Sequence, residues 1–182
     1  MPILEGFPTA EQKRTESCWA CAARMINNWF AKKSGKPTYD NDQALATAWS
    51  KSLDKGKDVK NPTNIDIPQS AAAALADLGY KNYTFTTVIA EPGEIADEIG
   101  KGHPLLALVG TEKPPKGEPN LNYKGGHWVV ITGISDDRKR IEVFDPDDGA
   151  KKFVLYDKSK YEREGYEMQF WQHTSYFYLS DK

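Results

Sequence analysis

Hydrophobic residues recur at three- and four-residue steps through the first part of the chain, which is the spacing of helices with one buried face. The clearest repeat covers residues 18–30, with Ser17 before it as a candidate N-cap, and the pattern ends at Gly35. Two further helices are predicted over residues 41–53 and 68–78. The first half of the chain is therefore predicted to be helical.

After Gly79 the apolar residues alternate with polar ones or form short continuous runs, and β-branched and aromatic residues become common. A short helix is predicted over residues 94–100 within this part. The predicted strands cover residues 83–89, 105–109, 127–134, 140–144, 152–156 and 175–179. Helices first and strands second predict an α+β domain in which an antiparallel sheet follows the helical part.

Turn-forming residues separate the later strands. Asp136-Asp137 and Asp147-Asp148-Gly149 are predicted to turn the chain between one strand and the next. Residues 111–126 are rich in proline and glycine and predict a loop. The loop is long for a compact domain, which marks it as a candidate functional segment.

The 182 residues suffice for one domain with a substantial core. We expect a single domain over residues 1–182, with a helical lobe over about 1–80 and a sheet lobe over about 81–182. The net charge is −2 and no block of basic residues occurs, which argues against a nucleic-acid-binding protein. Neither a classical signal peptide nor an apolar run long enough to span a membrane is visible.

Cys18 is the first candidate for chemistry. It is predicted to lie in the first turn of the first helix, where unpaired backbone N–H groups and the helix dipole favour a thiolate, the reactive form of a cysteine nucleophile. Gln12 precedes it by six residues. Its amide N–H could join the backbone N–H of Cys18 in holding the oxyanion that forms during acyl transfer.

His127 is the second candidate, because it opens a buried strand directly after Gly125-Gly126. The strand that it opens is predicted to form an antiparallel hairpin with residues 140–144, which brings His127 and Asp145 to the same end of the hairpin. Asp145 could then hold the imidazole in the tautomer that a catalytic base needs.

Four short motifs resemble those of papain-like cysteine peptidases, in the same order along the chain: Gln12, Ser17-Cys18-Trp19, Gly126-His127-Trp128 and Phe144-Asp145-Pro146. The Cys-Gly pair of the local papain signature is absent, the spacing from Cys18 to His127 is shorter than in papain, and Asp replaces Asn as the orienting residue. These departures resemble two compact bacterial branches, the avirulence proteases of plant pathogens and the bacteriocin-leader peptidase domains of export transporters.

The resemblance implies a papain-like fold with the active site in the cleft between a helical lobe and a sheet lobe. It implies a peptidase with Cys18 as nucleophile, His127 as base, Asp145 as orienting residue and Gln12 in the oxyanion hole. Such an enzyme acts on a protein or peptide and needs no metal and no organic cofactor. Related Cys-His-Asp domains also act as glutamine deamidases, transglutaminases or acyltransferases, and a catalytically silent binding module is a further alternative.

The candidate residues also have ordinary structural interpretations. Cys18 and Cys21 can be small core residues, and a Cys-x-x-Cys at a helix start also occurs in thioredoxin-like proteins, although there it follows a strand that is not predicted here. A zinc site would need two further ligands, and His103 and His173 are isolated in the sequence. His127 can be a buried strand histidine.

Cys18 lies so near Met1 that we expect no inhibitory pro-segment before it in this chain, and an active peptidase would need another control. We therefore expect a toxin or effector domain of a bacterial delivery system, restrained by a partner such as an immunity or inhibitor protein. Delivery by a specialised secretion system is expected, with the cytoplasm as the alternative location.

Overall fold

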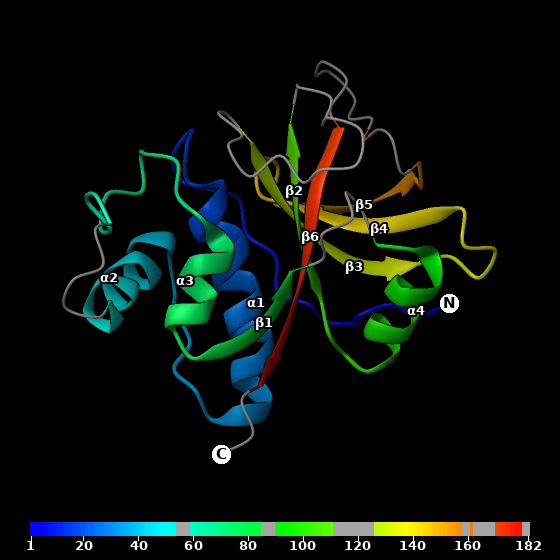
Figure 1. The fold of residues 1–182 in the computed structure, drawn as a ribbon, viewed down its shortest axis with the longest axis horizontal. Coiled ribbons are helices and arrows are strands. Elements are labelled where there is room, and N and C mark those ends of the chain that lie inside the picture. Colours follow the sequence, from blue (N-terminus) through cyan, green and yellow to red (C-terminus); the bar gives the residue numbers. More distant parts are fainter. Residues whose placement is uncertain (54–58, 85–89, 111–125, 158–160, 162–169, 180–182) are drawn as a thin grey trace.

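The computed structural model describes residues 1–53, 59–84, 90–110, 126–157, 161 and 170–179. Its helices are α1 (Cys18–Ser34), α2 (Asp42–Ser52), α3 (Ala71–Asp77) and α4 (Pro92–Gly100). Its strands are β1 (Tyr80–Thr84), β2 (Leu105–Gly110), β3 (His127–Ile134), β4 (Arg140–Asp145), β5 (Ala150–Leu155) and β6 (Phe170–Leu179) (Figure 1). None of the described helices is long and apolar enough to cross a membrane.

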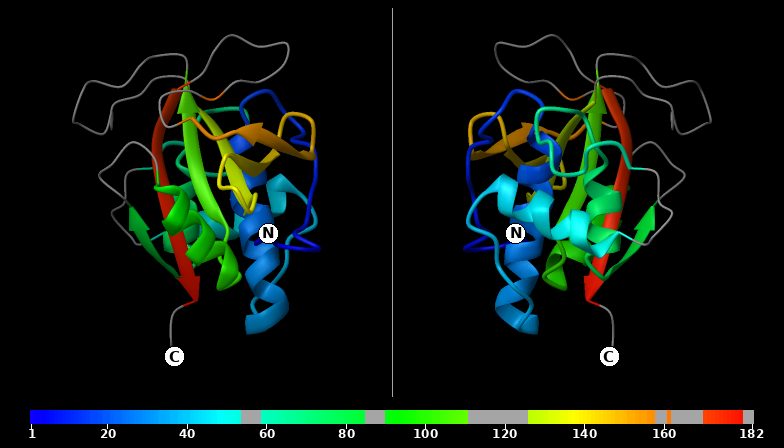
Figure 2. Two further views of the ribbon diagram at one scale, coloured as in Figure 1. Left: turned by 90° about the vertical axis from the view of Figure 1, so that its right-hand side faces the viewer. Right: turned by 90° about the vertical axis from the view of Figure 1, so that its left-hand side faces the viewer.

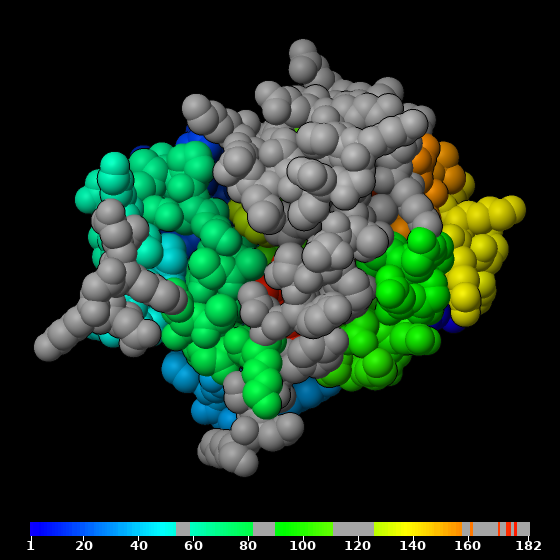
Figure 3. All heavy atoms as spheres, in the orientation of Figure 1, coloured from blue at the N-terminus to red at the C-terminus, as the bar shows by residue number. Residues whose placement is uncertain are grey.

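Within the described residues the strands form one antiparallel sheet in the order β1-β6-β2-β3-β4-β5. The helices α1, α2 and α3 precede the sheet in the chain and lie beside it (Figure 1), whereas α4 connects β1 to β2. In the space-filling view, α3 and α4 lie at opposite sides of one face of the molecule (Figure 3). The predicted α+β class is confirmed, and the arrangement is consistent with a papain-like fold.

The first helix is the main support of the helical part. It packs against α2, α3 and β3, and Figure 2 shows it alongside the sheet. It ends, as predicted, at Gly35, which has a left-handed φ of 67° and donates its N–H to the carbonyl of Ala31. Because all of its first ten residues are buried, its N-terminal end is held rigidly.

Strand β3 is buried, as predicted, and helices pack against it. Every residue from Trp128 to Ile134 is buried, and both α1 and α4 pack against the strand. The turn to β4 is stabilised by Asp137, whose Oδ1 accepts hydrogen bonds from the Ser135 hydroxyl at 2.6 Å and the Lys139 N–H at 3.1 Å. The predicted hairpin is therefore confirmed.

Three strands begin earlier than predicted, and for β5 the difference is two residues. β1 starts at Tyr80, directly after Gly79, whose φ of 85° ends the preceding helical segment. β6 starts at Phe170, because its pairing with β2 continues past a bulge, and pairing between distant strands leaves no local pattern. Residues 85–89 of the first predicted strand, and residues 111–125 of the predicted loop, lie outside the described residues.

Candidate active site

Cys18 is the first residue of α1 and is buried. Ser17 occupies the N-cap position, as predicted, but its side chain accepts no hydrogen bond from the helix. Its hydroxyl instead accepts the N–H of Arg14 at 3.1 Å and lies 2.9 Å from the carbonyl oxygen of the same residue. The N–H groups of the first helical turn are therefore not capped by the Ser17 side chain.

His127 and Asp145 meet at the end of the β3–β4 hairpin. The Nε2 of His127 lies 2.7 Å from the Oδ1 of Asp145, and both side chains are largely buried. Val130 is paired with Phe144, so the next position along β4, Asp145, lies diagonally across from His127 rather than directly opposite it. A histidine side chain is long enough to bridge that diagonal.

The ring of His127 also interacts with the thiol of Cys18. Burial by itself lowers the pKa of His127, but hydrogen bonds to Asp145 and Cys18 outweigh burial and raise the pKa to about 10. Because Nε2 faces Asp145, the nitrogen that remains for Cys18 is Nδ1. The ring thus joins the carboxylate of Asp145 to the thiol of Cys18.

Asp145 is held from two further sides. Its Oδ1 also accepts the backbone N–H of Asp147 at 3.0 Å, and its Oδ2 lies 3.4 Å from the hydroxyl of Tyr161. Tyr161 is buried and its ring packs against that of Trp171, with 5.0 Å between the ring centroids. Tyr161 is not predicted as a site residue from the sequence, because no local pattern around it indicates contact with a turn sixteen residues earlier.

Gln12 is hydrogen-bonded both to the turn after Asp145 and to the loop before Cys18. Its backbone N–H donates to the carbonyl of Pro146 at 2.7 Å, and its side-chain Nε2 donates to the carbonyl of Thr15 at 3.1 Å. Its Oε1 is buried and has no partner among the described residues. One of the two Nε2 hydrogens of Gln12 is used in the bond to Thr15.

Cys21 lies one helical turn from Cys18 and has a different environment. Its thiol donates to the carbonyl of Ala10 at 3.1 Å. Burial, followed by the nearby carboxylate of Asp42, raises the pKa of the Cys21 thiol to about 12. Cys21 is therefore a protonated core residue at neutral pH, in line with the packing interpretation of its position.

His103 does not join Cys18 and Cys21 in a metal site. The Nδ1 of His103 pairs with the Oε2 of Glu98 at 2.9 Å, and the side chain of His173 lies outside the described residues. Among the side chains that the structure describes, His127, Asp145 and Asp147 are the one trio with possible metal-ligand atoms within 4.8 Å of one another. Two members of this trio, His127 and Asp145, are hydrogen-bonded to each other.

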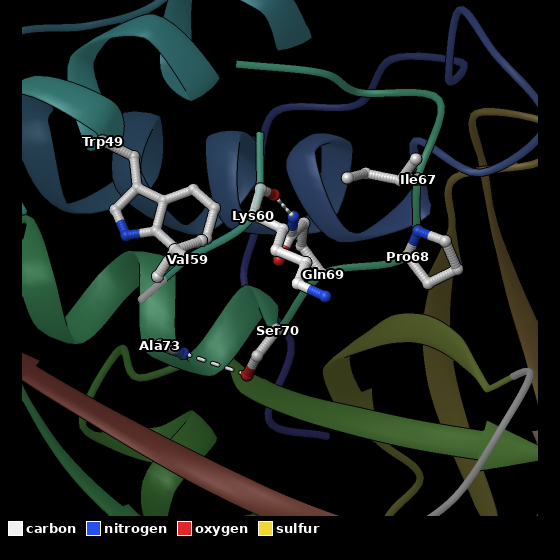
Figure 4. A pocket seen from close by; sticks show the side chains of 8 residues that line it. All are labelled: Trp49, Val59, Lys60, Ile67, Pro68, Gln69, Ser70 and Ala73. Carbon is white, nitrogen blue, oxygen red and sulfur yellow. Dashed lines mark hydrogen bonds between the residues drawn. The ribbon is translucent and has the colours of Figure 1, made fainter. Parts of the chain in front are cut away.

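A pocket of about 460 Å³ lies between α2, α3 and the segment before α3 (Figure 4). None of the predicted catalytic side chains lines the pocket. Two of its lining residues accept hydrogen bonds from the tryptophans that follow Cys18 and His127 in the sequence. The indole N–H of Trp19 donates to the carbonyl of Ile67, and that of Trp128 to the carbonyl of Gln69, both at 3.1 Å. The lining residues are Trp49, Val59, Lys60, Ile67, Pro68, Gln69, Ser70 and Ala73.

Nearly the whole chain corresponds to one protein family, since residues 4–176 match the model of the Peptidase C39-like family. The chain belongs to this family. Membership places it in the cysteine peptidase superfamily and implies a protein or peptide as substrate. No curated protein matches the sequence.

Proposed function

We propose that residues 1–182 form one catalytic domain, a cysteine peptidase whose triad is Cys18, His127 and Asp145. The observation that carries this proposal is the continuous interaction from the thiol of Cys18 through the His127 ring to the buried Asp145 carboxylate. Membership in a peptidase family supports the same reaction. In this triad Asp145 orients the His127 ring and stabilises the imidazolium.

The reaction follows from the atoms on each side of His127. The Cys18 thiolate attacks the carbonyl carbon of a peptide, and the resulting oxyanion is held by the Gln12 amide and the backbone N–H of Cys18. The imidazolium of His127 then gives its proton to the leaving amine as the C–N bond breaks. Water attacks the acyl-enzyme, His127 takes its proton, and the thiolate is released with the second product.

The mass of the products tests the type of reaction. The protein is incubated with a mixture of unmodified peptides, and we expect fragment pairs whose masses sum to a parent peptide plus water. A deamidase would instead leave every peptide at full length with an amide replaced by an acid, and an acyltransferase would add a whole group. Protein alkylated at Cys18 serves as the control, and either alternative product pattern contradicts peptide hydrolysis.

We further propose that the peptidase is a bacterial effector or toxin domain, restrained by an immunity or inhibitor protein and delivered by a specialised secretion system. The compact spacing of Cys18 and His127, and the Asp145-Pro146 pair, support this role, because they resemble the effector and bacteriocin-leader branches. Production of the active protein in bacterial cytoplasm is expected to inhibit growth, and Cys18→Ala to relieve the inhibition. Normal growth with soluble active protein would contradict a toxin role.

A further inference from the structure

A buried ion pair lies beneath the loop that leads to Cys18. The Oδ1 of Asp42 is 2.9 Å from the Nε of Arg24, and the two side chains are only 1% and 7% exposed. Arg24 also donates from its Nη1 to the carbonyl of Asp40 at 3.1 Å. Replacing a buried ion pair by packed apolar residues is often neutral or stabilising, so stability alone is a weak explanation for this pair.

The second oxygen of Asp42 faces the loop of residues 13–17, which joins Gln12 to Cys18. Oδ2 accepts the backbone N–H of Lys13 at 3.3 Å and lies 3.5 Å from the Ser17 hydroxyl. One carboxylate therefore contacts both ends of this loop. These contacts also account for the direction of the Ser17 hydroxyl, which faces the loop rather than the helix.

The loop between these two ends determines where the Gln12 side chain lies. The Gln12 amide donates to the carbonyl of Thr15, in the middle of the loop. The last residue of the loop, Ser17, directly precedes the N–H of Cys18. The two N–H groups proposed to hold the oxyanion are thus connected through a loop whose ends rest on Asp42.

We propose that Asp42, held by Arg24, is a positioning residue that sets the separation of the Gln12 amide and the Cys18 N–H. This inference rests on the proposed function, since it concerns the oxyanion of that reaction. Asp42 does not act by stabilising the thiolate, because a buried negative charge near a second negative charge is unfavourable. Its effect is confined to steps in which a carbonyl oxygen becomes charged.

Two reactions of Cys18 distinguish an effect on the oxyanion donors from an effect on the thiol itself. Alkylation by iodoacetamide forms an S–C bond with loss of iodide and creates no oxyanion. Addition of the Cys18 thiolate to a peptide aldehyde forms an S–C bond, and the electrons of the C=O π bond go to the carbonyl oxygen, which becomes the oxyanion of the adduct. The affinity for the aldehyde is measured by the protection it gives against alkylation.

Asp42→Asn and Gln12→Ala are expected to lower aldehyde affinity about tenfold each, because a small misplacement of an oxyanion donor has large effects. In the double variant the loss should be no greater than in Gln12→Ala alone, since Asp42 acts through Gln12. Alkylation of Cys18 should change less than about twofold in all three variants. Glu142→Gln is the matched control, because Glu142 is also a buried carboxylate and pairs with Lys151 in the sheet, away from the loop. It should change neither reaction.

Additive losses of aldehyde affinity would overturn the inference, and so would a parallel loss of alkylation in Asp42→Asn. If Asp42→Asn fails to fold, Ser17→Ala removes one end of the loop contact while keeping the ion pair, and it should show the same dependence on Gln12. If Cys18 of the unchanged protein reacts with iodoacetamide no faster than a free thiol, the proposed function itself fails, and the inference with it.

Discussion

Alanine at Cys18 or at His127 is expected to slow peptide cleavage by at least about a thousandfold, and the double replacement should cost little more than either change alone. The nucleophile and its proton-transfer partner act as one unit, so that either loss disables the other residue. His127 has two parts in the proposed reaction, because it protonates the leaving amine and later accepts a proton from water. The measurement is kcat/KM on a peptide identified from its fragments.

The same two variants test the thiolate–imidazolium pair directly. In the unchanged protein, Cys18 should be alkylated rapidly at pH values below those at which a free thiol ionises. In His127→Ala, labelling should follow an ordinary thiol titration. Intact mass should show one modified cysteine, because burial keeps Cys21 protonated.

His103→Gln is a matched control, since His103 also pairs with a buried carboxylate but packs against Phe30, twelve residues along α1 from Cys18. It should leave kcat/KM and alkylation unchanged. His127→Ala leaves Asp145 without its ring partner, so the thermal midpoint of each variant is measured alongside. Cleavage that survives in folded Cys18→Ala protein would contradict the assignment of the nucleophile.

Asp145→Asn is expected to lower kcat/KM by about a hundredfold or more at neutral pH, because the amide cannot stabilise the imidazolium and can favour the wrong tautomer. It should also change the pH profile. The pKa of His127 is raised from 6.5 to about 10, so the acid form needed by the leaving amine persists until the pH approaches 10. Without the Asp145 charge, the alkaline limb of kcat/KM should move toward pH 6.5.

The sign of the stability effect follows from the same raised pKa. A group that binds its proton more tightly in the folded state stabilises the fold fully below its unfolded pKa, and the stabilisation is lost as pH rises through the folded pKa. The contribution of the His127 proton to the free energy of unfolding should therefore decline between about pH 6.5 and pH 10. In Asp145→Asn this decline should be smaller and should end at lower pH.

Asp148→Asn is the control for this pH experiment, because the Asp148 carboxylate pairs with Lys152 and accepts the backbone N–H of Ala150. Its alkaline limb should stay near that of the unchanged protein. An alkaline limb that is the same in Asp145→Asn as in the unchanged protein would mean that Asp145 does not hold the charge of His127.

Much of the scaffold was predictable because its signals are local. The apolar repeat after Ser17 placed Cys18 at the start of a helix, and the double aspartate at 136–137 identified the hairpin that brings His127 and Asp145 together. Helical and strand periodicities arise from neighbouring residues along the chain, so they can be read without knowing the fold. The candidate triad depends on these local elements and on a single hairpin.

Other features were decided only by the tertiary structure. The sheet order places the last strand between the first and second, and the contacts of Tyr161 with Asp145 and of Asp42 with the loop before Cys18 join distant segments. The direction of the Ser17 hydroxyl likewise depends on its surroundings, since a serine at a helix start can cap the helix or bond elsewhere. Such contacts leave no periodic pattern, because they depend on which surfaces meet when the chain folds.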